Sequence, residues 1–563
     1  MMLLFIIVCM LILAVGYRFY GAYLGRRLEL DDSRPTPAVA MNDGVDYVPA
    51  GKSMLLGQHF SAISAAGPIV GPILAGIWFG WLPAALWILL GTIFIGGTHD
   101  FASLVASVRH KAASIGELAR QYMSRTSQVL YLIFVWFALV YVIIAFTDIT
   151  AQTFKTMSAS EALGPGVAVS SFLYLFLGVG LGLVLYKLKI KLWQATAVAI
   201  PLLMLMIWWG TVLPASVTRS LMAIPLKSWE VILLVYCCIA SLLPMWLLLQ
   251  PRGYLGGWFL YLTIATALFG ALFGGFSIQY PAFNTEGFVS LFNGKPLLPI
   301  VFITVACGAC SGFHGIVSAG TTSKQVARES DTRPVAYGSM VLEAVVAILA
   351  LVTLMILPKG DPLLKSDPNF IFAKGLSGYL GQAGVSSTLA LSFALLAFST
   401  FVYDTLDVCT RLARYILQEL FGWKSMAGAV AATLITLSLP LFFLMVTREK
   451  GYLAAWPIFG ISNQLLASLT LLAVSVWLIR TGKKALFAII PMVFMMVVAL
   501  WALVLQIRPF ITLLLSPRGA SGMKLDVMIS GICGVVLLIL SLWLVAESCR
   551  VIAAARRDGR LAA

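Results

Sequence analysis

Ionisable side chains are rare in the apolar segments of this chain, and those present are mainly histidines and carboxylates. Three of the four His lie inside apolar runs, together with several acidic residues. An ionisable group is costly at membrane depth, so its presence there usually marks an ion or substrate pathway. Histidine and carboxyl groups can also bind and release protons when their surroundings change. The set consists of His59, His99, Asp100, Asp148, His314, Glu343, Asp404 and Asp407.

Some members of this set have structural alternatives. Asp407 and Arg411 are four residues apart, so they can pair on one helix face. Asp148 lies near the end of its apolar run, where a structural role is the simpler interpretation. A metal site built from the His and Asp residues is another alternative, although none of them has the i, i+4 spacing of two ligands on one helix. We expect His59, Asp100 and Asp404 to be the proton or cation carriers.

The segment GQHFSAISAAGPIVGPILAG, residues 57–76, combines His59 with many helix-breaking residues. Gly and Pro interrupt the backbone hydrogen-bond ladder, and a membrane tolerates broken backbone only where protein or water covers it. We therefore predict a discontinuous helix that lines a cavity. Free amides at a half-helix N-terminus can hold a carboxylate, and free carbonyls can hold a cation. The expected contacts are Ser64 and the backbone from Gly67 to Gly71.

Two further segments have a similar character. Residues 239–257 include two Pro, and residues 306–322 include four Gly and a His. In these segments Ser241, Ser311 and His314 are the candidate substrate or ion contacts. Close helix packing through small residues is the alternative explanation for 306–322.

The composition places these segments in a lipid bilayer. The chain has 563 residues, of which 60% are hydrophobic and 11% are charged, and its mean hydropathy is +0.96. A soluble domain carries about 25% charged residues. The net charge of +15 comes from short basic blocks between apolar runs, which is typical of membrane topology rather than of a nucleic-acid-binding face. We expect the lipid bilayer as a partner and no nucleic acid.

Fifteen apolar runs are long enough to cross a bilayer, which requires about 20 mostly apolar residues. With the N-terminus outside, the cytoplasmic loops hold about twice as many Lys and Arg as the outer loops, as the positive-inside rule requires. The expected fold is an all-α polytopic membrane protein with its N-terminus outside and its C-terminus in the cytoplasm. The predicted spans are 2–24, 54–79, 81–107, 129–152, 165–186, 192–213, 229–250, 255–279, 297–322, 335–357, 386–410, 426–446, 452–478, 485–507 and 526–548.

The first two interrupted segments belong to the second and seventh of these spans. Because the two spans are five apart in the order, they enter the membrane from opposite sides, as a five-plus-five inverted repeat requires. The predicted organisation is a first span and loop at 1–53, a first repeat at 54–214, a second repeat at 228–424 and accessory helices at 426–563.

Six long stretches, in order along most of the chain, carry a family resemblance. They are DYVPAGKSMLLGQHFSAISAAGPIVGPILA (46–75), HDFASLVASVRHKAASIGELA (99–119), ASLLPMWLLLQPRGYL (240–255), ACGACSGFHGIVSAGTTSKQVARE (306–329), DTLDVCTRLARYILQE (404–419) and FGISNQLLA (459–467). At these residues the chain resembles the carbon starvation protein A family of bacterial inner-membrane proteins.

The resemblance implies a transporter of the large amino-acid and cation symporter superfamily, with the five-plus-five fold. It also implies uptake of peptides or, in some members, of pyruvate with protons. The chain departs from the family pattern in two places. It has Gln58-His59 where two His are common, which puts a role for paired His in doubt. It has Asp404 where Thr is more frequent, and the added carboxylate can alter ion coupling.

These observations favour a secondary active transporter in a bacterial inner membrane. It would import a small nutrient, either a pyruvate-type carboxylate or a short peptide, with H⁺ or Na⁺ as the coupling ion. No Walker A motif is present, so ATP-driven pumping is not supported. No cofactor is expected, and the oligomeric state is left open. The alternative is an intramembrane metal-dependent enzyme or a nutrient sensor.

Overall fold

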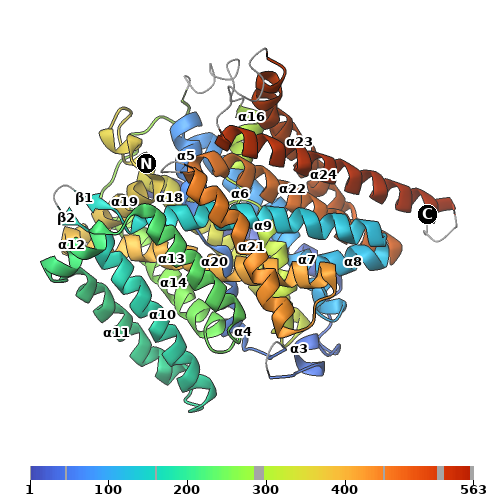
Figure 1. The fold of residues 1–563 in the computed structure, drawn as a ribbon, viewed down its shortest axis with the longest axis horizontal. Coiled ribbons are helices and arrows are strands. Elements are labelled where there is room, and N and C mark those ends of the chain that lie inside the picture. Colours follow the sequence, from blue (N-terminus) through green and yellow to red (C-terminus); the bar gives the residue numbers. More distant parts are fainter. Residues whose placement is uncertain are drawn as a thin grey trace.

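A computed structural model describes residues 2–44, 47–158, 161–284, 297–447, 451–516 and 525–557. The described chain is almost entirely helical (Figure 1), which confirms the predicted all-α class. Twelve helices in this part are long and apolar enough to cross a membrane, and fourteen if two bent helix pairs each count as one span. The remaining predicted span, 297–322, is divided between two shorter helices. The exact number of spans therefore stays a prediction.

The N-terminal half contains α1 (Met2–Val15), η1 (Gly16–Tyr20), α2 (Gly21–Leu28), α3 (Pro37–Ala40), α4 (Lys52–Ile63), α5 (Gly67–Phe79), α6 (Trp81–Gly91), η2 (Thr92–Gly96), α7 (Gly97–Arg109), α8 (Ile115–Tyr122), α9 (Arg125–Thr153), α10 (Gly164–Tyr186), α11 (Leu192–Thr211), α12 (Ala215–Ala223), α13 (Leu226–Leu242) and α14 (Leu249–Phe273). The short strands β1 (Met157–Ser158) and β2 (Glu161–Ala162) pair antiparallel between α9 and α10.

The C-terminal half contains α16 (Leu297–Thr304), α17 (Gly312–Gly320), η4 (Thr322–Lys324), η5 (Glu329–Asp331), η6 (Arg333–Gly338), α18 (Ser339–Met355), η7 (Pro362–Lys365), α19 (Pro368–Gln382), α20 (Ser387–Phe421), α21 (Met426–Val446), α22 (Gly451–Arg480), α23 (Leu486–Leu514) and α24 (Leu525–Arg557).

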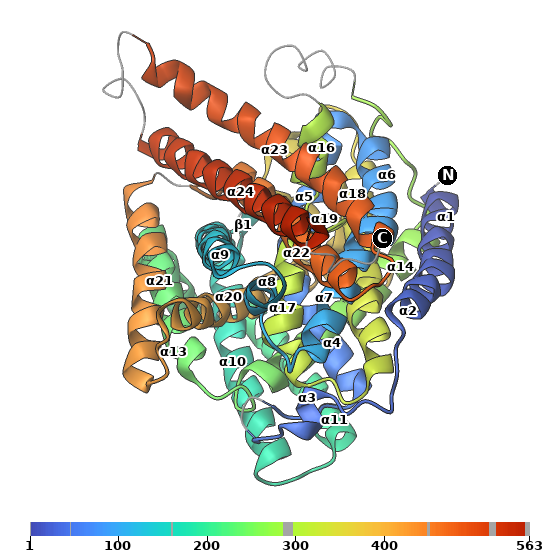
Figure 2. The same cartoon turned by 90° about the vertical axis from the view of Figure 1, so that its right-hand side faces the viewer.

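The bundle has a buried centre and an apolar rim. The apolar parts of α9, α18, α20 and α22 are mostly buried, whereas those of α1, α11, α23 and α24 are mostly not. Figure 2 shows α23 and α24 side by side along one edge, with α1 at another. The rim exposes large apolar side chains such as Leu4, Phe19 and Trp208. Lipid tails can cover such a surface, so the rim is the expected lipid-facing boundary.

The predicted interruption within 57–76 is confirmed. Helix α4 ends at Ile63, and α5 begins at Gly67 with a bend of 45° between them. Pro68 lies in the first turn of α5, where a missing backbone amide breaks no helical hydrogen bond. The residues at the break are buried, as broken backbone in a membrane requires.

The other two predicted interruptions are also present, but the span boundaries differ at the first of them. Helix α13 ends at Leu242 and α14 begins at Leu249, so Pro251 and Arg252 lie in the first turn of α14. Proline is tolerated there for the reason given for Pro68. The predicted spans left Arg252 in a loop, and this placement is wrong because its side chain is fully buried.

Two sets of elements follow the same order along the chain. Each begins with an interrupted helix (α4–α5 or α16–α17) and continues with a helix that contains a π-helical segment, a shorter helix, and a long one (α9 or α20). The sets pack reciprocally, because α5 contacts α18, α7 contacts α17, and α9 contacts α20. The peptide RGYLGGW at the start of α14 is also similar to KGYLAAW at 450–456.

This order favours inverted repeats that begin at α4 and at α16, with α10 and α11 as an inserted hairpin that projects from the bundle (Figures 1 and 2). The boundaries predicted from the sequence, 54–214 and 228–424, stay a prediction.

Loops predicted to lie on the cytoplasmic side contact one another. Arg109 Nε donates to Glu329 Oε1 over 2.9 Å, and Lys483 Nζ lies 2.7 Å from Glu29 Oε2. The hydrogen bond from Lys483 holds the pKa of Glu29 below its usual value. These contacts support the predicted alternation of loops between the two sides. Which side faces the cytoplasm stays a prediction.

Candidate functional site

The breaks in α4–α5 and α16–α17 lie against each other. A Cβ atom on Gly67 would come within 3.0 Å of the Cys307 side chain, and a Cβ on Gly71 would come equally close to the Thr304 carbonyl oxygen. Real Cβ atoms essentially never approach so closely, so glycine allows the two interrupted helices to touch. The predicted substrate contacts at Gly67 and Gly71 stay a prediction, and in this conformation Cys307 and Thr304 occupy the adjoining space.

We expect Gly71→Ala to lower stability by about 1–3 kcal/mol, because the added methyl group meets backbone that cannot rotate away. Thermal unfolding of the purified protein in detergent measures the change. Gly378→Ala is the matched control, since a Cβ on Gly378 in α19 meets nothing within 4 Å. Equal unfolding temperatures for the two variants would contradict the close contact of the two breaks.

His314, in the first turn of α17, connects two buried carboxylates on neighbouring helices. Its Nδ1 lies 2.8 Å from Asp100 Oδ2 on α7, and its Nε2 lies 3.2 Å from Glu343 Oε2 on α18. His99 Nδ1 lies 2.7 Å from Asp100 Oδ1. All four side chains are completely buried. We refer to His99, Asp100, His314 and Glu343 as the histidine cluster.

The charges of the histidine cluster favour the binding of a proton. Among the described residues, neither oxygen of Glu343 accepts a hydrogen bond, because His314 Nε2 is near but poorly aligned. No Lys or Arg of the described chain forms an ion pair with Asp100 or Glu343. Two unneutralised carboxylates are very unfavourable in a dry interior, so the cluster is expected to hold at least one exchangeable proton.

Asp404 belongs to a second group, centred on Arg252. Arg252 Nε donates to Asp404 Oδ1 over 2.6 Å, and Nη2 donates to the Tyr403 carbonyl over 3.1 Å. The guanidinium also contacts Asp407 and the Tyr236 hydroxyl. Tyr236 in turn donates to Asp407 Oδ2 over 2.7 Å. We refer to Arg252, Asp404, Asp407 and Tyr236 as the arginine network.

The arginine network contains two carboxylates and one guanidinium, so its ionised form has one excess negative charge. Ser61 on α4 donates a hydrogen bond to Asp404 Oδ2 and thereby links the first interrupted helix to α20. A buried group of this charge could be balanced by a proton or a cation, and the role of Asp404 as a carrier stays a prediction.

The predicted pairing of Asp407 with Arg411 is not found, because Asp407 pairs with Arg252 instead. Arg411 Nη2 donates to the carbonyls of Ala240 and Leu243, over 2.9 and 2.6 Å. Arg411 therefore satisfies the carbonyl groups left free where α13 ends.

His59 and Asp404 line the same small cavity, with Gln58, Gly253 and Thr322. His59 Nδ1 lies 2.8 Å from Thr322 Oγ1. The volume open to the centre of a water molecule is about 10 Å³, which is enough for about one water. A small cavity thus lies beside 57–76, and in this conformation it is too small for a nutrient, so a substrate chamber at this place stays a prediction.

The three predicted serine contacts have different surroundings. Ser311, just before α17, donates to Asn463 Oδ1 over 3.2 Å, and the same oxygen accepts from the Phe313 amide. Ser64 lies at the first break, and its buried hydroxyl has no partner among the described residues. Ser241 bonds Thr433 on α21 over 3.1 Å, and among the described residues no hydrogen bond joins it to another predicted site residue.

The structure adds Arg252 and Asn463 to the candidate site, and it also adds Glu343, which was in the set of ionisable residues but not among the expected carriers or contacts. The charge of Glu343 within an apolar run was the only local signal for it, because no Gly or Pro interruption lies beside it. Asn463 lies in the family-like stretch FGISNQLLA but is uncharged. Within the described ranges, no group of three or more His, Cys, Asp or Glu has an arrangement that could hold a metal ion.

Comparisons with known proteins give a consistent result. Residues 1–371 and 361–502 match the family model described as Carbon starvation protein CstA. The chain is 30% identical to the Peptide transporter CstA of Campylobacter jejuni, over 90% of this chain and 80% of that protein. It is 30% identical to the Peptide transporter CstA of Bacillus subtilis, over 95% and 94%. It is 29% identical to the Pyruvate/proton symporter BtsT of Escherichia coli, over 88% and 80%.

Proposed function

The chain belongs to the carbon starvation protein CstA family, and from this we propose that it is a proton-coupled secondary transporter. Its substrate would be a small carboxylate or a short peptide, taken up across a bacterial inner membrane during carbon starvation. The relatives are named for transport rather than catalysis, which favours this function over an intramembrane metal-dependent enzyme.

The histidine cluster is the observation that carries the proposal. His314 lies in the first turn of an interrupted helix, while its two carboxylate neighbours lie on α7 and α18. A movement of α17 would change the distances from His314 to both carboxylates, and these distances set the proton affinity of all three groups. A conformational change could therefore load a proton on one side of the membrane and release it on the other. Sodium stays the alternative coupling ion.

The paired breaks support the choice of an anionic or zwitterionic substrate. Helix α5 begins at Gly67, and the N-terminal end of a helix favours a carboxylate. The hydroxyl of Ser64, buried beside this helix end, is a further donor that has no partner among the described residues. A substrate carboxylate bound here would accept hydrogen bonds from the Ser64 hydroxyl and from the N-terminal end of α5.

Uptake into proteoliposomes tests the proposal. With labelled pyruvate or a labelled dipeptide, we expect accumulation when the outside is made acidic, and loss of accumulation with a protonophore. One proton per substrate gives about tenfold accumulation for each imposed pH unit, since one pH unit corresponds to about 1.4 kcal/mol. If accumulation requires a sodium gradient and does not change with pH, the coupling ion is sodium and not the proton. Uptake no faster than into empty liposomes, under either gradient, would contradict transport of these substrates.

A further inference from the structure

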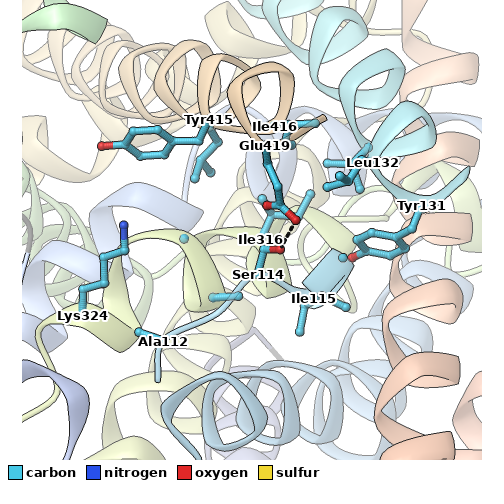
Figure 3. A pocket seen from close by; sticks show the side chains of 15 residues that line it. Ala112, Ser114, Ile115, Tyr131, Leu132, Ile316, Lys324, Tyr415, Ile416 and Glu419 are labelled. Carbon is cyan, nitrogen blue, oxygen red and sulfur yellow. Dashed lines mark hydrogen bonds between the residues drawn. The ribbon is translucent and has the colours of Figure 1, made fainter. Parts of the chain in front are cut away.

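A larger cavity lies on the predicted cytoplasmic side, among α8, α9, α17 and α20 (Figure 3). Its volume is about 250 Å³, and it shares no lining residue with the small cavity beside His59. Most of the lining is apolar, with Leu132, Ile316 and Ile416 among the contributors. A cavity of this size could hold a small organic molecule with an apolar part.

One polar feature of the cavity is the carboxylate of Glu419, near the end of α20. Its Oε1 accepts hydrogen bonds from Ser114 Oγ over 3.0 Å and from Gln128 Nε2 over 2.9 Å. Figure 3 shows the Ser114 contact and the Glu419 carboxylate directed into the cavity. For Oε2, no donor is found in the part of the chain that the structure describes. The two hydrogen bonds therefore hold the Glu419 carboxylate in place, and its Oε2 can still bind a ligand.

The second polar feature is Lys324, at the end of η4. Its Nζ lies over the rings of Tyr415 and Tyr47, 5.1 and 5.5 Å from the ring centres. No carboxylate of the described ranges forms an ion pair with it. Cation–π contacts hold an ammonium group in place without neutralising its charge. In Figure 3, Lys324 and Tyr415 lie on one side of Glu419, and Tyr131 lies on the other.

We propose that this cavity binds a zwitterion with an apolar side chain, of the size of an amino acid or a dipeptide. The ligand ammonium would meet Glu419 Oε2, its carboxylate would meet Lys324 Nζ, and its side chain would cover the apolar wall. A monocarboxylate would leave Glu419 without a cation, and an amine would leave Lys324 without an anion. The inference goes beyond the transport reaction proposed above and does not depend on it.

Equilibrium binding to the purified full-length protein in detergent tests the proposal, with calorimetry as the readout and alanylleucine as the probe. We expect Glu419→Gln and Lys324→Gln each to weaken binding about tenfold, because each removes one charge-assisted contact. N-acetylation of the probe should weaken binding to the unmodified protein and make it insensitive to Glu419→Gln. Amidation of the probe carboxylate should likewise make binding insensitive to Lys324→Gln.

Lys374→Gln is the matched control, because Lys374 is exposed on α19 and outside the cavity. It should bind alanylleucine as the unmodified protein does, and all variants should unfold at similar temperatures without ligand. Unchanged affinity in both cavity variants, an equal loss in Lys374→Gln, or no binding of alanylleucine would overturn the proposal. Because no ion gradient is involved, these outcomes are separate from failure of proton-coupled uptake.

Discussion

Glu343→Gln should abolish gradient-driven accumulation of substrate and leave the protein folded. Glutamine has nearly the same shape as glutamic acid but cannot release a proton. Glu343 is fully buried and faces His314 without a good hydrogen bond, so the substitution removes a titrating group and little else. Accumulation in proteoliposomes should fall from about tenfold per imposed pH unit to no accumulation. Exchange of labelled for unlabelled substrate across the membrane should remain measurable, because exchange does not require proton release.

Glu161→Gln provides the control for this experiment. Glu161 is exposed in β2 and should be replaceable with no effect on either assay. If Glu343→Gln accumulates substrate to the level of Glu161→Gln, Glu343 does not carry the coupling proton, and Asp100 and Asp404 become the stronger candidates.

Arg252→Met should destabilise the protein by about 3–5 kcal/mol, because Asp404 and Asp407 would then remain buried without their counter-ion. Thermal unfolding in detergent measures the loss. The double variant Arg252→Met with Asp407→Asn should recover part of it, since it removes one of the two unpaired charges as well. The recovered free energy of unfolding measures the coupling between Arg252 and Asp407. A purely steric role of Arg252 would not produce such a coupling.

Arg219→Met is the comparison for Arg252→Met, because Arg219 is an exposed arginine on α12. Equal unfolding temperatures for these two variants would show that Arg252 is not the counter-ion of the buried carboxylates.

The interrupted helices could be predicted from the sequence because their cause is local. Gly and Pro near His59, and Gly on both sides of His314, weaken a helix locally, and the structure places breaks in these segments. The importance of Glu343 could not be predicted in the same way. Its partner His314 lies on another helix, and only the packing of α17 and α18 brings the two side chains together.

Arg252 shows how a local rule can mislead. An arginine directly after a proline is typical of a loop at the membrane surface, so the sequence placed it there. The opposite charges that retain it in the interior lie on α20, more than 150 residues away in the chain. Ser241 was predicted from its position near a helix break, and its hydroxyl bonds Thr433 on α21 in this conformation, so its binding role stays a prediction.

Both buried charge groups connect elements of the first set to elements of the second. Asp100 on α7 contacts His314 on α17, and Ser61 on α4 contacts Asp404 on α20. A rocking movement of one set against the other would therefore have to break or rebuild both groups in the same step. Without its bound proton or substrate, the protein would have to move while an unpaired charge lies in an interior that excludes water. The free-energy cost of that charge would oppose the movement. The same construction would thus suppress futile leakage of ions when no nutrient is bound.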